Sequence, residues 1–188
     1  MTEEKAETVA FHLERPVVLV GLMGSGKSCV GRRLAVRLGL PFRDADAEFE
    51  TAAGCTISEY FAQFGEASFR EGERRVIARL LEGPPCVLAT GGGAFCQPET
   101  RARIKEGAVS VWLRADLGLL LKRTIGRDHR PLLKQGDPRE ILAKLMASRH
   151  PLYAEADITV DTTDDPPEVT VAAVLAAVGD YLESSHVP

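Results

Sequence analysis

Short apolar runs alternate with amphipathic stretches along the chain, and this pattern predicts its secondary structure. Val17-Val18-Leu19-Val20 is an apolar run that ends in glycine, which is typical of a strand buried on both faces. Apolar residues then recur at i, i+4 and i+8 and predict a helix from Lys27 to Leu38. Gly39 follows the last of these positions, where glycine commonly ends a helix.

The same alternation continues toward the C-terminus. Thr56 and Glu59 fit a capping box that starts a helix, and a further helix is predicted from Glu66 to Leu81. Three more apolar runs predict strands, and one more helix closes the chain: the strands are Cys86–Ala89, Val109–Leu113 and Ile158–Val160, and the helix is Pro167 to about Leu182. Because strands alternate with helices, we predict an α/β fold in which helices cover both faces of a parallel sheet.

The length of the chain suits one domain of this kind. Its 188 residues are enough for a sizeable buried core, and neither an internal repeat nor an interdomain linker divides them. Residues 1–13 are polar and lack periodicity, so we expect a disordered tail ahead of a single domain over residues 14–188. Residues 124–137 are the most charged and glycine-punctuated stretch, and we expect them to form a mobile loop.

Charge and cysteine spacing narrow the function classes. The formal net charge of -4 argues against a general nucleic-acid binder, and no apolar stretch approaches the length of a membrane span. The start of the chain lacks the basic and apolar regions of a secretory signal. The four cysteines form neither a CxxC pair nor a zinc pattern. We therefore expect a cytoplasmic protein without nucleic-acid or membrane partners. We also expect a monomer.

The strongest motif lies between the first strand and the first helix. Gly21 to Ser28 reads G-L-M-G-S-G-K-S and matches G-x-x-x-x-G-K-[ST] in full. Its glycines let backbone N–H groups surround phosphate oxygens, Lys27 can reach the β- and γ-phosphates, and the Ser28 hydroxyl can bind magnesium. A chance glycine-rich turn is the alternative, but the complete motif in its strand–loop–helix context favours a nucleotide site. The loop alone would equally suit a GTPase or a motor ATPase.

Two acids follow Pro41-Phe42-Arg43, just after a second strand candidate. Asp44 and Asp46 stand one residue apart, and the carboxyl ends of parallel strands are where such folds bind ligands. One acid could hold magnesium through water, and the other could orient an acceptor hydroxyl or accept its proton. The alternative is structural, because Asp46 could be the N-cap of a helix over residues 47–50.

Glycines and arginines supply the remaining candidates. Gly91-Gly92-Gly93 follows a buried strand, and three consecutive glycines favour a close approach of the backbone to a ligand over a simple tight turn. Arg70, Arg130 and Arg149 each stand in a distinctive segment, and the planar guanidinium group matches carboxylate and phosphate oxygens. Taken singly, each arginine is more often a solvated surface charge, so only their joint occurrence carries weight.

Together these segments resemble the shikimate kinases. In chain order they read G-L-M-G-S-G-K-S, D-A-D, G-E-A-S-F-R, G-G-G-A, R-P-L-L, R-x-P-L-Y and V-D-T, and they cover nearly everything from Val17 to the last helix. The resemblance implies a three-layer α/β/α fold, like that of the nucleoside-monophosphate kinases, with a five-stranded parallel sheet. It implies phosphorylation of the 3-hydroxyl of shikimate by ATP with Mg²⁺, a step toward the aromatic amino acids.

The resemblance also implies a role for each candidate residue. Asp46 would bind the shikimate hydroxyls as the candidate base, Arg70 and Arg149 would clamp the carboxylate, and Arg123 would lie against adenine. Arg130 would reach the transferring phosphate from a lid at about residues 124–137. The catalytic set is Lys27, Asp46 and Arg130; the ATP contacts are Gly24, Ser25, Gly26, Lys27, Ser28, Cys29, Arg123 and Arg130; the substrate contacts are Asp46, Arg70, Gly91, Gly92, Gly93 and Arg149; and the metal ligands are Ser28 and, through water, Asp44. Cys29 departs from the family pattern, in which threonine usually follows the loop serine.

Two rival functions stay open on the sequence. A gluconate-kinase-like or nucleoside-monophosphate-kinase-like enzyme would share the loop and the fold, although the R-P-L-L and R-x-P-L-Y segments favour an acceptor with a carboxylate. A kinase-like binding protein without catalysis would be expected to have lost Lys27, Ser28, Asp46 or Arg130, and all four are present.

Overall fold

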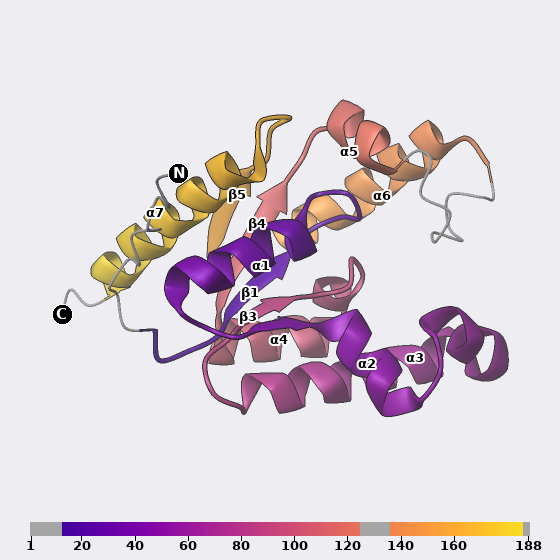
Figure 1. Ribbon diagram of the computed structural model, residues 1–188. Helices are drawn as coiled ribbons and strands as arrows, with labels where there is room; N and C mark the ends of the chain where they lie inside the picture. Colours follow the sequence, from indigo (N-terminus) through magenta and orange to yellow (C-terminus); the bar gives the residue numbers. More distant parts are fainter. Residues whose placement is uncertain (1–12, 125–135, 186–188) are drawn as a thin grey trace, which may run out of the picture.

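A computed structural model describes residues 13–124 and 136–185, and in these residues the predicted alternation becomes a three-layer α/β/α domain (Figure 1). All five strands are parallel, in the order β2-β3-β1-β4-β5. Their bounds are β1 Val17–Val20, β2 Phe42–Asp44, β3 Val87–Ala89, β4 Val109–Arg114 and β5 Ile158–Asp161. The chain extends from β1 to β2 and β3 on one side and later adds β4 and β5 on the other. The carboxyl end of β1 is therefore a topological switch point, where α/β folds bind ligands.

Seven α-helices and one short 3₁₀ helix are found in the described residues. They are α1 Lys27–Leu38, α2 Ala45–Ala53, α3 Ile57–Leu81, η1 Ala94–Cys96, α4 Pro98–Gly107, α5 Leu117–Thr124, α6 Pro138–Tyr153 and α7 Pro167–Ser185. Helices α1 and α7 pack together on one face of the sheet. Helices α3, α4, α5 and α6 supply the apolar residues of the other face. The fold is thus the one that the sequence predicted.

Strand β1 lies in both hydrophobic cores at once. Its four side chains are completely buried, with Val17 and Leu19 in the core under α1 and α7 and Val18 and Val20 in the core under the other helices. Burial of each such side chain contributes about 1.5–3 kcal/mol to folding. The strand that leads into the phosphate-loop motif is therefore packed on both faces of the sheet.

Several local predictions are confirmed. Helix α1 begins at Lys27 and ends at Leu38, with Gly39 as its C-cap in the left-handed conformation. Thr56 and Glu59 form the predicted capping box. The two helices expected after it form one element, α3, which is interrupted at Gly65 (φ +77°). Glycine adopts this conformation without the strain that a Cβ would cause, so the chain can turn there between two helical segments.

Helices α4, α5 and α6 were not predicted. Only Thr100 and Ile104 of α4 are buried, so its sequence shows little apolar periodicity. Helix α6 contains Pro151, which lacks a backbone N–H donor and usually argues against a helix, but only two helical residues follow this proline.

The predicted tail and mobile loop fall mainly outside the described residues. Leu13, the last residue assigned to the tail, is buried in the core, whereas residues 1–12 are outside the described part. Residues 125–135, with Arg130, are also outside it; Thr124 ends α5 and Asp137 is the N-cap of α6. Within the described ranges, no helix is both long and apolar enough to cross a membrane.

Candidate active site

The phosphate-loop motif connects the carboxyl end of β1 to the start of α1. Gly26, the N-cap of α1, has φ +97°, a conformation that L side chains rarely adopt. The first turn of α1 carries no acidic residue, so no side chain of the helix itself opposes the positive end of its dipole. Lys27 donates from Nζ to the carbonyl oxygens of Gly21 and Leu22, at 2.7 and 2.9 Å. The loop therefore presents backbone N–H groups, a helix N-terminus and an ammonium group together, as an anion site requires.

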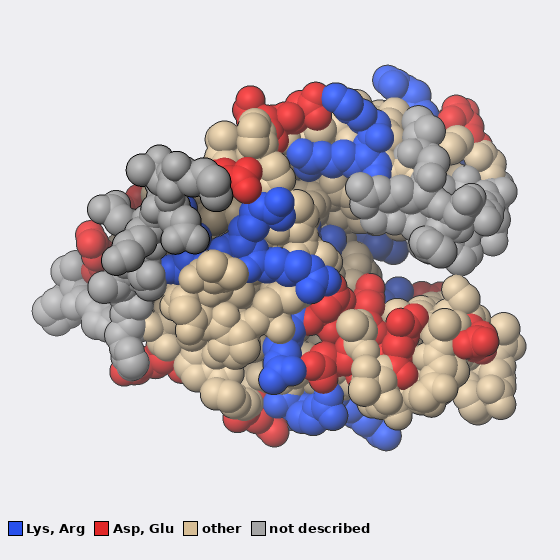
Figure 2. All heavy atoms as spheres, in the orientation of Figure 1, with Lys and Arg blue, Asp and Glu red and all other residues tan. Residues whose placement is uncertain are grey.

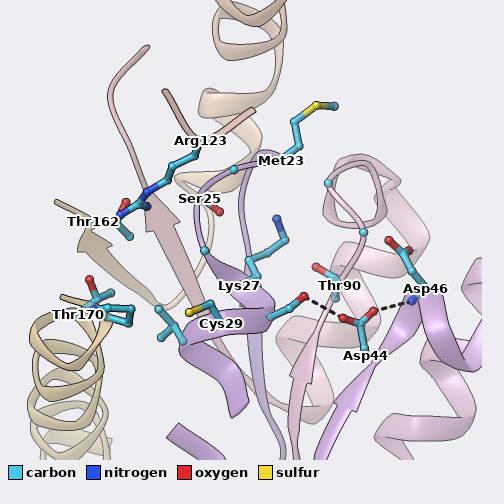
Figure 3. Close-up of a pocket in the computed structure, with 17 residues that line it drawn as sticks. Met23, Ser25, Lys27, Cys29, Asp44, Asp46, Thr90, Arg123, Thr162 and Thr170 are labelled. Atoms are coloured by element: carbon cyan, nitrogen blue, oxygen red, sulfur yellow. Dashed lines mark hydrogen bonds between the residues drawn. The ribbon is translucent and has the colours of Figure 1, made fainter. Parts of the chain in front are cut away.

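A pocket of about 510 Å³ opens over this loop (Figure 3). Arg123, Thr162 and Thr170 lie at one end, Asp44, Asp46 and Thr90 lie at the other, and Lys27 lies between them. Figure 2 shows the face that is hollowed between the α5–α6 side and the α2–α3 side, with acidic side chains gathered on the latter. The residues that line the pocket are Met23, Gly24, Ser25, Gly26, Lys27, Ser28, Cys29, Val30, Asp44, Asp46, Thr90, Gly91, Gly92, Arg123, Thr162, Pro167 and Thr170.

Ser28 and Asp44 form an oxygen pair suited to a hard divalent cation. The Ser28 hydroxyl donates to Asp44 Oδ2 at 2.8 Å, and both residues line the pocket (Figure 3). No group of three or more His, Cys, Asp or Glu side chains in the described residues could hold a metal by itself. Mg²⁺ commonly binds to one or two protein oxygens and completes its shell with water and substrate phosphates, so the pair fits a metal that arrives with a nucleotide. The Ser25 hydroxyl is buried in the same pocket without a hydrogen-bond partner among the described residues, which leaves it available to a polar ligand.

The end of the pocket that is lined by Asp44, Asp46 and Thr90 is called the acceptor end below. The helix cap at this end is Asp44, not Asp46. Asp44 ends β2 and caps α2, and its Oδ1 accepts a hydrogen bond from the Asp46 backbone N–H at 3.1 Å. Asp46 therefore lies in the first turn of α2, where its carboxylate lines the pocket. The structural alternative for Asp46 is thus wrong, because the capping role belongs to the neighbouring acid.

Asp46 faces a second acid, Glu73, across Gly91. A Cβ on Gly91 would lie 2.8 Å from Asp46 Oδ1 and 2.8 Å from Glu73 Oε1, so glycine is required where the two carboxyl groups approach the backbone. Asp46 is exposed to solvent on its outer side. Partial burial of the carboxyl group among its neighbours, followed by repulsion from Asp44, nevertheless raises its pKa. Burial also raises the pKa of Glu73, against the opposing charge of Arg70. Sequence reasoning missed Glu73, although its i+3 spacing from Arg70 was a signal.

Two arginines from distant parts of the chain meet at consecutive glycines. Arg70, on α3, donates to Glu73 Oε2 at 2.7 Å, and its guanidinium carbon would lie 2.8 Å from a Cβ on Gly93. Arg149, on α6, donates to the carbonyl oxygen of Gly92 at 3.1 Å. Both guanidinium groups thus lie at the glycine loop, beside the acceptor end of the pocket. Gly91 and Gly92 line the pocket itself, whereas Gly93 is buried and lies against the guanidinium group of Arg70.

Gly93→Ala should disturb Arg70 without disturbing the fold. The backbone at Gly93 (φ −98°, ψ −13°) is open to any residue, but the new methyl group would collide with the guanidinium group. We expect the KM for the acceptor to rise about tenfold through loss of a charged contact, with the KM for ATP unchanged. Steady-state kinetics test this against Gly107→Ala, whose added methyl group would meet no atom within 4 Å. Equal acceptor KM values in the two variants would contradict the role of Arg70.

The raised pKa of Asp46 should appear in the pH dependence of turnover. A protonated carboxyl cannot accept a proton, so with Asp46 as the base we expect activity to be lost as the pH falls through the pKa of Asp46. We expect the acid limb of kcat/KM for the acceptor to lie above pH 3.8, the ordinary value for aspartate. Glu73→Gln should keep this limb, since Glu73 is the other carboxyl group with a raised pKa at the site. A limb that disappears in Glu73→Gln would assign the titration to Glu73 instead.

A glycine-rich phosphate loop at the switch point of a parallel sheet, with a lysine, a serine–aspartate pair and an adjacent acceptor pocket, defines a P-loop kinase with the fold of the nucleoside-monophosphate kinases. Comparison with known proteins identifies the family. The shikimate kinase family model matches residues 23–179. The chain belongs to the shikimate kinase family, and it is a kinase that uses ATP together with a divalent metal ion.

Relatives and solved structures agree with this assignment. The chain is 68% identical over 178 residues to the shikimate kinase of Paramagnetospirillum magneticum, and the aligned residues cover 95% of this chain and 91% of that protein. It is 57% identical over 179 residues to the enzyme of Rhodopseudomonas palustris, covering 95% and 88%. The structure of shikimate kinase from Acinetobacter baumannii in complex with shikimate has a TM-score of 0.85 at 36% identity, covering 93% of this chain and 96% of that one. These findings favour the shikimate kinases over the gluconate-kinase-like alternative.

Proposed function

We propose that this protein transfers the γ-phosphoryl group of ATP to the 3-hydroxyl of shikimate, giving shikimate 3-phosphate and ADP on the route to the aromatic amino acids. The observation that carries the proposal is the acceptor end of the pocket. Asp46 lines this end of the pocket, and beside it Arg70 and Arg149 reach the consecutive glycines Gly93 and Gly92. Two guanidinium groups suit a carboxylate, and an acid beside the phosphate loop suits a reacting hydroxyl; shikimate has both groups.

Each residue then has a role in an in-line displacement. The acceptor oxygen forms its bond to the γ-phosphorus as the bond to the β,γ-bridging oxygen breaks, and Asp46 orients the hydroxyl and accepts its proton. Lys27 exchanges its contacts with the loop carbonyls for β- and γ-phosphate oxygens. Arg70 and Arg149 hold the carboxylate so that the reacting hydroxyl lies in line, and Arg123 contacts adenine. Arg130, which is outside the described residues, is assigned to the transferring phosphate.

Mg²⁺ is the proposed metal, held by Ser28 and, through water, by Asp44. The support is their 2.8 Å oxygen pair beside the phosphate loop, a small set of hard ligands that leaves room for phosphates and water. When bound, Mg²⁺ neutralises charge on the phosphate oxygens. Free cysteines at positions 29, 55, 86 and 96 are compatible with the proposal of a reducing cytoplasm. A monomer without nucleic-acid or membrane partners remains part of this proposal.

ADP release from the purified protein with Mg-ATP tests the reaction. Shikimate, gluconate, AMP and no acceptor are compared in a coupled assay at matched protein concentration. Release that depends on shikimate alone is expected. Release with gluconate or AMP instead would keep the phosphate loop and overturn the acceptor pocket. If the protein binds ATP but releases no ADP with any acceptor, the result would favour a catalytically inactive binding protein.

A further inference from the structure

The end of α6 supplies two hydrogen bonds to one carbonyl group of the glycine loop. Tyr153, the last residue of α6, is completely buried, and its hydroxyl donates to the carbonyl oxygen of Gly92. Arg149, one helical turn earlier, donates to the same oxygen at 3.1 Å. The Cys96 thiol makes a longer contact with this oxygen, at 4.0 Å, so Tyr153 and Arg149 are its two close donors. Burial raises the pKa of Tyr153, which keeps the hydroxyl protonated and therefore a donor.

The Tyr153 ring packs against an aromatic side chain of the sheet. Its centroid lies 5.9 Å from that of Trp112, and His150 stacks edge-on against the same tryptophan at 5.0 Å. Trp112 pairs in register with Val20, the last residue of β1 before the phosphate loop. The Tyr153 ring thus packs against β4, the strand next to the end of β1 where the phosphate loop begins.

Gly92 also lies beside the phosphate loop. A Cβ on Gly92 would lie 3.6 Å from the backbone nitrogen of Met23 and 3.7 Å from the carbonyl oxygen of Gly21. The glycine loop is therefore bonded to α6 on one side and lies next to the phosphate loop on the other. A rotation of the peptide at Gly92 would move Gly91 and Gly93, which face Asp46 and Arg70.

We propose that Tyr153 is a positioning residue, whose hydroxyl, together with Arg149, fixes the Gly92 peptide and so sets the acceptor end of the site against the phosphate loop. The Tyr153 side chain is completely buried and its hydroxyl bonds to Gly92, so it acts through Gly92 and not on the substrate. The proposal rests on the proposed function, in which the acceptor hydroxyl must be aligned with the γ-phosphorus. In-line transfer is sensitive to displacements of about 1 Å, so a loosened loop slows the reaction more than it weakens ATP binding.

Tyr153→Phe tests this inference because it keeps the buried ring and removes only the hydroxyl. We expect kcat/KM for shikimate to fall about tenfold, while the Kd for ATP stays within about twofold of wild type. Tyr60→Phe is the matched control, since it also removes a tyrosine hydroxyl bond, to Ser68 Oγ at 3.0 Å, away from the glycine loop. Its acceptor kinetics should stay at the wild-type level, and the two variants should have similar Tm values.

Amide hydrogen exchange decides the inference independently of the reaction. In Tyr153→Phe, amides of residues 90–97 should exchange about tenfold faster than in wild type, with β1 and α7 unchanged. Unchanged exchange there overturns the inference, as does an equal loss of ATP and acceptor affinity. If wild type releases no ADP with shikimate, the proposed function fails, and the exchange rates alone still confirm or overturn the role of Tyr153.

Discussion

Asp46→Asn is expected to lower kcat by about a hundred- to ten-thousandfold, the range for loss of a general base, while ATP binding survives. The amide keeps the size of the side chain but cannot accept the acceptor proton. The helix cap stays intact because Asp44, not Asp46, caps α2. Single-turnover kinetics with shikimate and equilibrium titration with ATP measure the two effects separately. Full turnover in this variant would remove Asp46 from both the base role and the orienting role.

Glu50→Gln is the control for the loss of one negative charge on the same helix. Glu50 lies on α2, and its Oε1 accepts a hydrogen bond from the Ile57 backbone N–H at 2.9 Å, a bond that the glutamine oxygen can preserve. Its turnover should remain within about twofold of wild type, because the residue does not line the pocket. A comparable loss in both variants would mean that the charge of α2, and not the Asp46 carboxylate, carries the effect.

Arg149→Ala is expected to raise the KM for shikimate by about ten- to a hundredfold, the value of a lost hydrogen bond to a charged group. One of its nitrogens is used by the Gly92 carbonyl, which leaves other guanidinium N–H groups for the carboxylate. Because Gly92 also loses a donor, kcat should fall as well, but by a smaller factor. The KM for ATP should be unchanged in initial-rate measurements.

Two further variants separate charge from geometry at this position. Arg149→Lys keeps the charge without the planar fork, so only partial recovery of the acceptor KM is expected. Arg139→Ala removes an exposed arginine from the same helix and should leave the acceptor KM unchanged. An unchanged KM in Arg149→Ala would show that the carboxylate clamp is misassigned. Full recovery of the acceptor KM in Arg149→Lys would show that the positive charge alone makes the contact.

Elements with a strong local pattern could be predicted from the sequence. Helix α1 was predicted from Lys27 to Leu38 because its apolar spacing and its glycine stop are both local, and the Thr56–Glu59 capping box is equally local. Helix α4 was missed because it buries few residues, and α6 because Pro151 contradicts its pattern in the last turn. These helices owe their stability to tertiary packing more than to local preference.

The candidate site divides in the same way. By itself the sequence determined the phosphate loop, because the loop is one continuous segment whose residue types meet the demands of phosphate binding. The assembly of the acceptor end was decided only by the tertiary structure: Asp46, Arg70 and Arg149 lie on α2, α3 and α6, and they meet at glycines that follow β3. Glu73 and Tyr153 became visible only through burial and contact with that loop. Strand order brings these segments together, and it depends on packing between residues far apart in the chain, which no local pattern specifies.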